Sequence, residues 1–109
     1  MNVSIQLEAL RLAVQQGSIE WQKHCLQRMV EREISRNEVM EVILKGEKIE
    51  DYPNDWPLPS ALFFLGGSAQ RPLHVVAAFN SELKKAFIIA AYEPDLIHFE
   101  SDLKTRRKR

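Results

Sequence analysis

Residues 73–92 read LHVVAAFNSELKKAFIIAAY, and this stretch decides the fold class. It contains two apolar runs rich in strand-forming residues, 73–79 and 85–92, on either side of a short polar turn. Two such runs around a turn predict a β-hairpin. Upstream, 48–52 and 60–65 have the composition of two more strands, and the three prolines between them exclude regular pairing there. We therefore expect an antiparallel sheet in the second half of the chain.

The first half of the chain has the pattern of helices. Apolar residues recur at helical spacing in three segments, 3–16, 22–33 and 36–45. Gly17 provides a left-handed stop for the first segment, and Ser35 with Glu38 forms a capping box that starts the third, with Gly46 as its stop. Helices followed by strands indicate an α+β domain. We expect N-terminal helices packed on three or four antiparallel strands in sequence order.

Two shorter segments are assigned from fewer residues. Ile19 and Trp21 alternate with polar residues, which is compatible with a short strand before the second helix. After the last strand, a short helix over 95–103 is expected to pack Leu96 and Phe99 on the sheet.

Length and composition describe a single domain over 1–109. The chain is 45% hydrophobic and 28% charged, which excludes disorder, and its 15 basic and 15 acidic residues leave no net field that attracts nucleic acid. No apolar run approaches the roughly 20 residues that cross a bilayer. The polar residues after Met1 do not resemble an export signal, and the single cysteine, Cys25, suits a reducing compartment. We expect a cytoplasmic protein with no membrane contact.

A stripe of basic residues follows the second predicted helix. His24, Arg28 and Arg32 are spaced i, i+4, i+8 and therefore lie along one side of it. A histidine that titrates near neutrality beside arginines suits phosphate chemistry, because the arginines hold the anion and the histidine moves a proton. The alternative is an exposed stripe paired with Glu31 and neighbouring acids, and spacing alone favours this alternative.

Two further candidate residues lie in the predicted hairpin. His74 interrupts an apolar strand, on the face opposite Leu73 and Val75. It is a candidate general acid or base if that face opens on a cleft. Otherwise it is a histidine at the edge of the core that bonds a neighbouring carbonyl, which the sequence favours. Tyr92 ends the last strand, where it either stacks on a base or buries its ring and keeps a wet hydroxyl.

The sequence predicts neither a metal nor another cofactor. His24, His74, His98 and the acids show no zinc-site spacing, and there is no phosphate loop or dinucleotide fingerprint. The last six residues, 104–109, contain five positive charges, Arg106 and Arg107 among them. Such a tail either holds RNA phosphates or an acidic partner, or is a solvated terminus.

A set of short motifs spans most of the chain: His24 to Arg32, Ile34-Ser35, Glu38-Val39, Gly46-Glu47, Ile49-Glu50, Tyr52-Pro53, Arg71 to Val76 and Tyr92-Glu93-Pro94. In this succession the chain resembles a bacterial family of domains of unknown function, number 4258, over residues 19–107. That family is similar to the RelE-like toxins, in which one or two N-terminal helices pack on a small antiparallel sheet. The resemblance therefore implies a single RelE-like toxin domain.

The same resemblance implies a metal-independent, mRNA-interferase-like endoribonuclease of a toxin-antitoxin pair. Its partner would be an antitoxin protein similar to zinc-finger antitoxins of the MqsA type, and its substrate RNA, free or on the ribosome. Carried over by position, the family's functional residues fall on His24, Arg28, Arg32, His74 and Tyr92. In this interpretation the two histidines are the acid and base of 2′-hydroxyl attack, the helix arginines clamp the phosphate, and the tyrosine stacks on or orients a base. Arg106 and Arg107 would contact further phosphates.

A non-catalytic interaction module with the same fold is the alternative. The neutral net charge favours it, because phosphate contacts dominate affinity for RNA. Ala90 and Ala91 also favour it, since relatives usually carry a threonine before the tyrosine. The two classes differ in geometry. Convergence of the two histidines, Arg28 and Tyr92 on one open pocket favours the enzyme, whereas their scatter favours the module.

Overall fold

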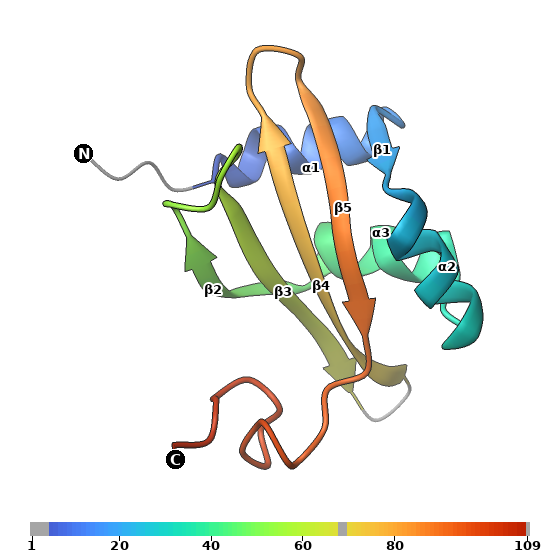
Figure 1. Ribbon diagram of the computed structural model, residues 1–109, viewed down its shortest axis with the longest axis vertical. Helices are drawn as coiled ribbons and strands as arrows, with labels where there is room; N and C mark the ends of the chain where they lie inside the picture. The colour runs from blue at the N-terminus through green and yellow to red at the C-terminus, as the bar shows by residue number, and fades with distance from the viewer. Residues whose placement is uncertain (1–4, 68–69, 109) are drawn as a thin grey trace.

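The sheet of this protein is mixed and has five strands (Figure 1). The structure is a computed structural model that describes residues 5–67 and 70–108. Its elements are α1 (Leu7–Gln15), β1 (Ile19–Trp21), α2 (Lys23–Glu31), α3 (Arg36–Lys45), β2 (Glu47–Tyr52), β3 (Ser60–Gly67), β4 (Gln70–Asn80) and β5 (Lys85–Tyr92). The strand order is β1-β5-β4-β3-β2. None of the described helices is long and apolar enough to span a membrane.

The α+β class is confirmed, and so is the antiparallel order of β2 to β5. The expected sheet of three or four antiparallel strands was wrong in one respect. Ile19–Trp21 forms a fifth strand at the edge, parallel to β5, with Ile19 opposite Ala86 and Trp21 opposite Ile88. Alternation in the sequence indicated a strand here, but three residues contain no information on its partner or direction.

Local signals end and start the helices as predicted. Gly17 has φ +77°, the left-handed conformation that ends α1. At the start of α3, Ser35 Oγ accepts from the Glu38 N–H at 3.1 Å, and Glu38 Oε1 accepts from the Ser35 N–H at 2.9 Å. Gly46 ends α3 in an extended conformation instead, and a side chain there would collide with carbonyl oxygens of α3 and β3. The expected start of the first helix at residue 3 lies outside the described residues.

The expected helix over 95–103 does not form, and this prediction was wrong. Residues 93–108, here called the C-terminal segment, contain turns and an isolated bridge. The Asp95 side chain caps one helical turn, but the next amide, that of Glu100, bonds the carbonyl of Thr105 at 2.8 Å. A single turn gains too few hydrogen bonds to persist against this pairing.

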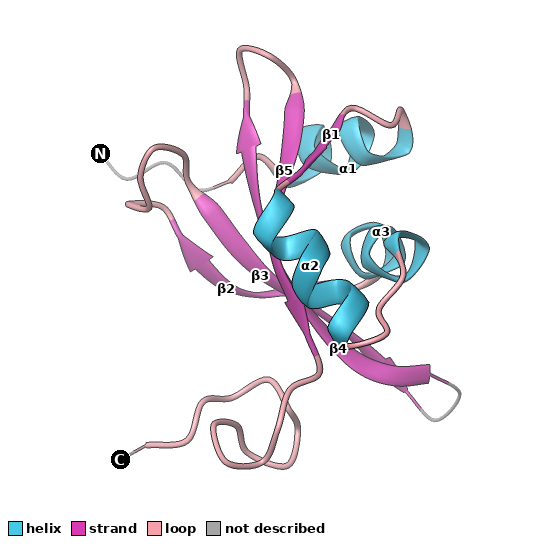
Figure 2. Ribbon diagram, turned by 45° about the vertical axis from the view of Figure 1, so that its right-hand side comes forward, coloured by secondary structure: helices cyan, strands magenta, loops and turns pink. Residues whose placement is uncertain are grey.

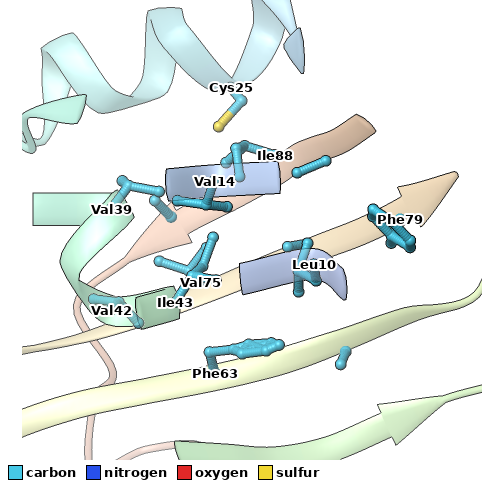
Figure 3. Close-up of a cluster of buried hydrophobic side chains, with 14 of the residues drawn as sticks. Leu10, Val14, Cys25, Val39, Val42, Ile43, Phe63, Val75, Phe79 and Ile88 are labelled. Carbon is cyan, nitrogen blue, oxygen red and sulfur yellow. The ribbon is translucent and has the colours of Figure 1, made fainter. Parts of the chain in front are cut away.

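The main core lies between the helices and one face of the sheet. Buried apolar side chains from both layers meet there (Figure 3): Leu10, Val14, Cys25, Val39, Val42, Ile43, Phe63, Val75, Phe79 and Ile88. α1 and α3 cover this face, and α2 packs alongside β5 (Figure 2). Val30 of α2 does not join this core and is 79% exposed. Burial of apolar area in this core is the main source of stability.

The opposite face of the sheet, here called the outer face, has a more polar composition. Strand register aligns Glu47, Phe64, His74 and Tyr92 in one row across β2, β3, β4 and β5. The C-terminal segment, which follows β5 (Figure 1), packs on this row: the Phe99 ring lies edge-on to the His74 ring, with 4.6 Å between the ring centroids. Phe99 thus packs on the sheet as predicted, at 3% exposed, whereas Leu96 is 57% exposed.

Candidate functional site

A cleft of about 570 Å³ opens where the end of β5 meets the end of α2 and the C-terminal segment. It is lined by Arg32, Tyr92, Glu93, Asp95, His98, Phe99 and Arg106. Arg32 is the residue that ends α2, and Tyr92 is the last residue of β5. The cleft therefore combines three parts of the chain that only the tertiary fold brings together.

Two arginines give the cleft its positive charge. Arg32 Nη1 donates to the Ala91 carbonyl at 2.8 Å, which fixes the end of α2 on β5. Arg106 Nε lies 2.9 and 3.1 Å from the carboxylate oxygens of Glu50, and its guanidinium stacks over the Phe99 ring at 5.0 Å. A guanidinium has five N–H donors. Both arginines therefore keep donors that an anion in the cleft can use.

A carboxylate holds a histidine at the cleft. The Asp95 side chain accepts from the backbone N–H of His98 at 2.9 Å, and its two oxygens lie 2.9 and 3.2 Å from His98 Nδ1. These hydrogen bonds keep the pKa of Asp95 below its ordinary value, so the carboxylate is ionised at neutral pH. An ionised carboxylate requires a proton on Nδ1, which leaves Nε2 of His98 as a proton acceptor.

His74 lies behind Tyr92 and is fully buried, at 0% exposed. Its Nε2 is 2.7 Å from the Leu103 carbonyl, which only accepts, so Nε2 carries the proton. Nδ1 is then left to accept from the Tyr92 hydroxyl at 3.3 Å. Burial lowers the pKa of His74 and raises the pKa of Tyr92, so both groups are neutral near pH 7. This is the carbonyl-bonded alternative of the sequence analysis, and His74 positions Tyr92.

The remaining predicted residues lie outside the cleft. His24 and Arg28 are exposed on α2, and Arg28 pairs with Glu31 at 3.5 Å, as the alternative interpretation of the stripe expected. Arg107 donates to the Leu96 carbonyl and to Glu100. Of the seven site residues predicted from the sequence, Arg32, Tyr92 and Arg106 line the cleft. The four residues proposed as catalytic do not converge on one open pocket.

Sequence reasoning missed Glu93, Asp95, His98 and Phe99 as cleft residues. The spacing of Asp95 and His98 was visible and is typical of a capped turn, but nothing in the sequence places that turn beside Arg32. Across the described ranges, 5–67 and 70–108, no three His, Cys, Asp or Glu side chains form a metal-binding group. The side chains of the cleft can themselves accept a proton, at His98, and stabilise negative charge, through Arg32 and Arg106.

Fold and cleft together define a small α+β domain with a polar cleft at one end of its sheet. The family model described as Domain of unknown function (DUF4258) matches residues 21–93, more than half of the chain. The chain belongs to this family, which confirms the resemblance. No curated protein and no solved structure matches the chain. The matched region includes Arg32 and Tyr92 and ends before Asp95 and His98.

Proposed function

We propose that this protein is a metal-independent endoribonuclease of the RelE-like type, the toxin of a cytoplasmic toxin-antitoxin pair. The observation that carries the proposal is the cleft itself, in which a carboxylate-held histidine and two arginines come together beside Tyr92. Phosphodiester transfer needs a proton acceptor, a proton donor and positive charge at the phosphate. The cleft contains the proton acceptor and the positive charge, and water supplies the proton donor.

In the proposed reaction, Nε2 of His98 accepts the proton of the RNA 2′-hydroxyl as its oxygen attacks the adjacent phosphorus. A bond forms between the 2′ oxygen and phosphorus, and the bond to the 5′ oxygen breaks. The products are a 2′,3′-cyclic phosphate and a 5′-hydroxyl; the leaving 5′ oxygen takes its proton from solvent, and His98 returns the proton it accepted to solvent. Arg32 and Arg106 stabilise the charge on the phosphate oxygens. Asp95 holds the imidazole in the required tautomer.

The proposed partner is an antitoxin protein, acidic or with a zinc finger of the MqsA type, that covers the cleft and the basic end of the C-terminal segment. In the structure, part of that basic charge is already paired within the chain: Lys104 with Glu47 at 3.2 Å, and Arg106 with Glu50. The pair of Lys104 with Glu47 is exposed, and Arg106 is the exposed member of its pair with the more buried Glu50. Exposed pairs contribute little to stability. An acidic partner can therefore replace them at small cost.

The test measures cleavage of RNA by the purified protein in EDTA, with naked RNA and with translating ribosomes. His98→Ala should lower the rate by about 10²-fold or more, the scale of a lost acid-base group. Asp95→Asn should also lower it, because the tautomer is no longer fixed. Lys45→Ala, an exposed residue of α3 paired with Glu41, is the matched control and should be silent. A 2′-deoxy substitution at the cleaved linkage should block the reaction.

An interaction module is the second candidate, and two observations favour it. His24, Arg28 and His74 do not line the cleft, and the carboxylates of Glu93 and Asp95 offset the charge of the two arginines there. A module predicts no cleavage that His98→Ala abolishes, under either substrate condition. That result would contradict the endoribonuclease and favour the interaction module.

A further inference from the structure

A second cleft, of about 340 Å³, lies on the outer face away from the first. Its lining includes Trp56 and Leu58 from the loop between β2 and β3, Phe87 and Ile89 from β5, and Gln22, the residue before α2. Trp56 is 90% exposed. A large aromatic ring that stands in solvent beside an apolar pocket is a feature of binding surfaces. The proposed function makes no use of it.

Two elements connect this second cleft with the first. Gln22, at the start of α2, lines the second cleft, and Arg32, at its end, lines the first. α2 is nine residues long, or about 14 Å at 1.5 Å per residue. β5 runs alongside it (Figure 2), with Phe87 in the second cleft and Tyr92 in the first. The two clefts are thus the two ends of one track along α2 and β5.

The basic stripe of α2 runs along this track. Residues four apart lie on one flank of a helix, so His24 and Arg28 share the flank of Arg32, which reaches the first cleft. Leu26, which lies on the other flank, packs against the core, and His24 and Arg28 are exposed. Between the two clefts the track therefore presents an imidazole and a guanidinium to solvent, the guanidinium paired with the exposed Glu31 at 3.5 Å.

We propose that this track binds single-stranded RNA, with one base stacked on Trp56 in the second cleft and the intervening phosphates beside Arg28 and His24. An unpaired base offers the flat ring that an exposed indole stacks on, whereas a paired base does not. Arg28 and His24 can donate hydrogen bonds to the phosphates of a strand between the two clefts, and an apolar peptide has no such anionic groups. The inference rests on the proposed function in one respect, that the same strand enters the first cleft.

The test of the stacked base uses a ten-nucleotide RNA with 2′-O-methyl riboses, which cannot be cleaved by 2′-hydroxyl attack. Trp21→Phe leaves Trp56 as the one remaining tryptophan of the chain. In that background the oligonucleotide should quench Trp56 fluorescence. In the otherwise unchanged protein, Trp56→Ala should weaken binding about tenfold, within the range for one stacked base. Leu83→Ala, an exposed apolar residue of the β4–β5 turn, should leave affinity unchanged.

The phosphate contacts are tested by the dependence of RNA affinity on salt concentration. Arg28→Ala should lower the slope of log affinity against log salt concentration by about 0.7, the value for one phosphate of a single strand. Lys45→Ala removes an exposed positive charge from α3 and should leave the slope unchanged.

The outcomes separate this inference from the proposed function. Cleavage that depends on His98, together with no quenching of Trp56 and equal affinity of Trp56→Ala, would overturn the track and leave the enzyme in place. Quenching and a tenfold loss without any RNA cleavage would support the track and remove the enzyme. Quenching by duplex RNA as strongly as by the single strand would overturn the stacked base.

Discussion

The two faces of the sheet are closed in different ways. On the helix side, Phe63 and Val75 are buried under α1 and α3, two helices with the periodicity and end signals of helices in the sequence itself. On the outer face, His74 is equally buried, but under a segment of turns. Equal burial therefore depends on helices with local sequence signals on one face and on long-range contacts of the C-terminal segment on the other.

The contacts that close the outer face are individually weak. The C-terminal segment is held by Phe99, by the bond from His74 to the Leu103 carbonyl, and by exposed ion pairs such as Lys104 with Glu47. Exposed pairs contribute about 0 to 1 kcal/mol each. Parts of a protein with few buried apolar contacts open locally before the whole molecule unfolds. The segment should therefore undock while the helix side stays folded.

The largest expected change in the free energy of unfolding comes from removing one buried phenylalanine on each face of the sheet. Phe63→Ala should lower the free energy of unfolding by about 3 to 5 kcal/mol, the usual cost of emptying a phenylalanine site in a core. Phe99→Ala should lower it by about 1 to 3 kcal/mol, because the segment undocks instead of leaving a cavity. Urea unfolding gives both values. For Phe99→Ala, hydrogen exchange should show lost protection only in 93–108. An equal loss of protection throughout the chain in both variants would contradict a separate undocking of the C-terminal segment.

The next effect is a pH dependence that belongs to the outer face. Burial holds the pKa of His74 below its ordinary value of 6.5, while Glu50 raises that pKa and Arg106 lowers it. Just below pH 6.5 the unfolded chain therefore binds a proton that the folded chain does not. The contribution of neutral His74 to the free energy of unfolding is complete above pH 6.5 and is lost as pH falls below it. The loss is at most about 1.4 kcal/mol per pH unit, the limit for one proton.

The measurement is the free energy of unfolding between pH 7.5 and 5.5, compared with that of His74→Gln. The variant keeps a donor for the Leu103 carbonyl but does not titrate, so the difference between the two proteins isolates His74 from the carboxylates. A stability difference that does not change with pH would show that His74 is as easily protonated in the folded state as in the unfolded one.

The smallest expected change in stability concerns the capping box that starts α3, on the helix side of the sheet. Ser35→Ala removes one half of the capping box that starts α3 and should cost about 1 kcal/mol. Thermal unfolding checks this value, and Ser35→Asp, which restores an N-cap acceptor, should recover most of the loss. A cost near zero would mean that packing of α3 on β3 and β4 fixes the helix start without its cap.

The sequence predicted the parts of the fold that depend on neighbours along the chain. The capping box at Ser35, the left-handed Gly17 and the β4–β5 hairpin are local features, and each is found where expected. β1 had the pattern of a strand, but its pairing with β5 depends on residues far along the chain. The expected helix over 95–103 failed because Asp95 caps a turn in either case, and only the pairing of Glu100 with Thr105 decides that the turn stops.

The candidate site was predictable in part for the same reason. Arg32 was selected as part of the basic stripe on the second helix and Tyr92 as a tyrosine at the end of a strand, and the fold brings both to the cleft. His98 was considered only as a metal ligand, because the sequence does not show that Asp95 bonds it or that both lie beside Arg32. His74 was selected as unusual in an apolar strand, and the Leu103 carbonyl that bonds it comes from a segment whose position the sequence does not show.

The parallel pairing of β1 with β5 has a consequence for how the chain folds. It joins Ile19, in the first quarter of the chain, to Ala86, in the last quarter. Pairings between distant positions are slow to form, because the entropy of closing the loop is lost before any contact compensates for it. During synthesis the three helices emerge before β3, β4 and β5 exist, so their apolar sides stay unpaired in the nascent chain. This order makes the interval before β5 emerges the period in which the protein is most prone to aggregate or to need a chaperone.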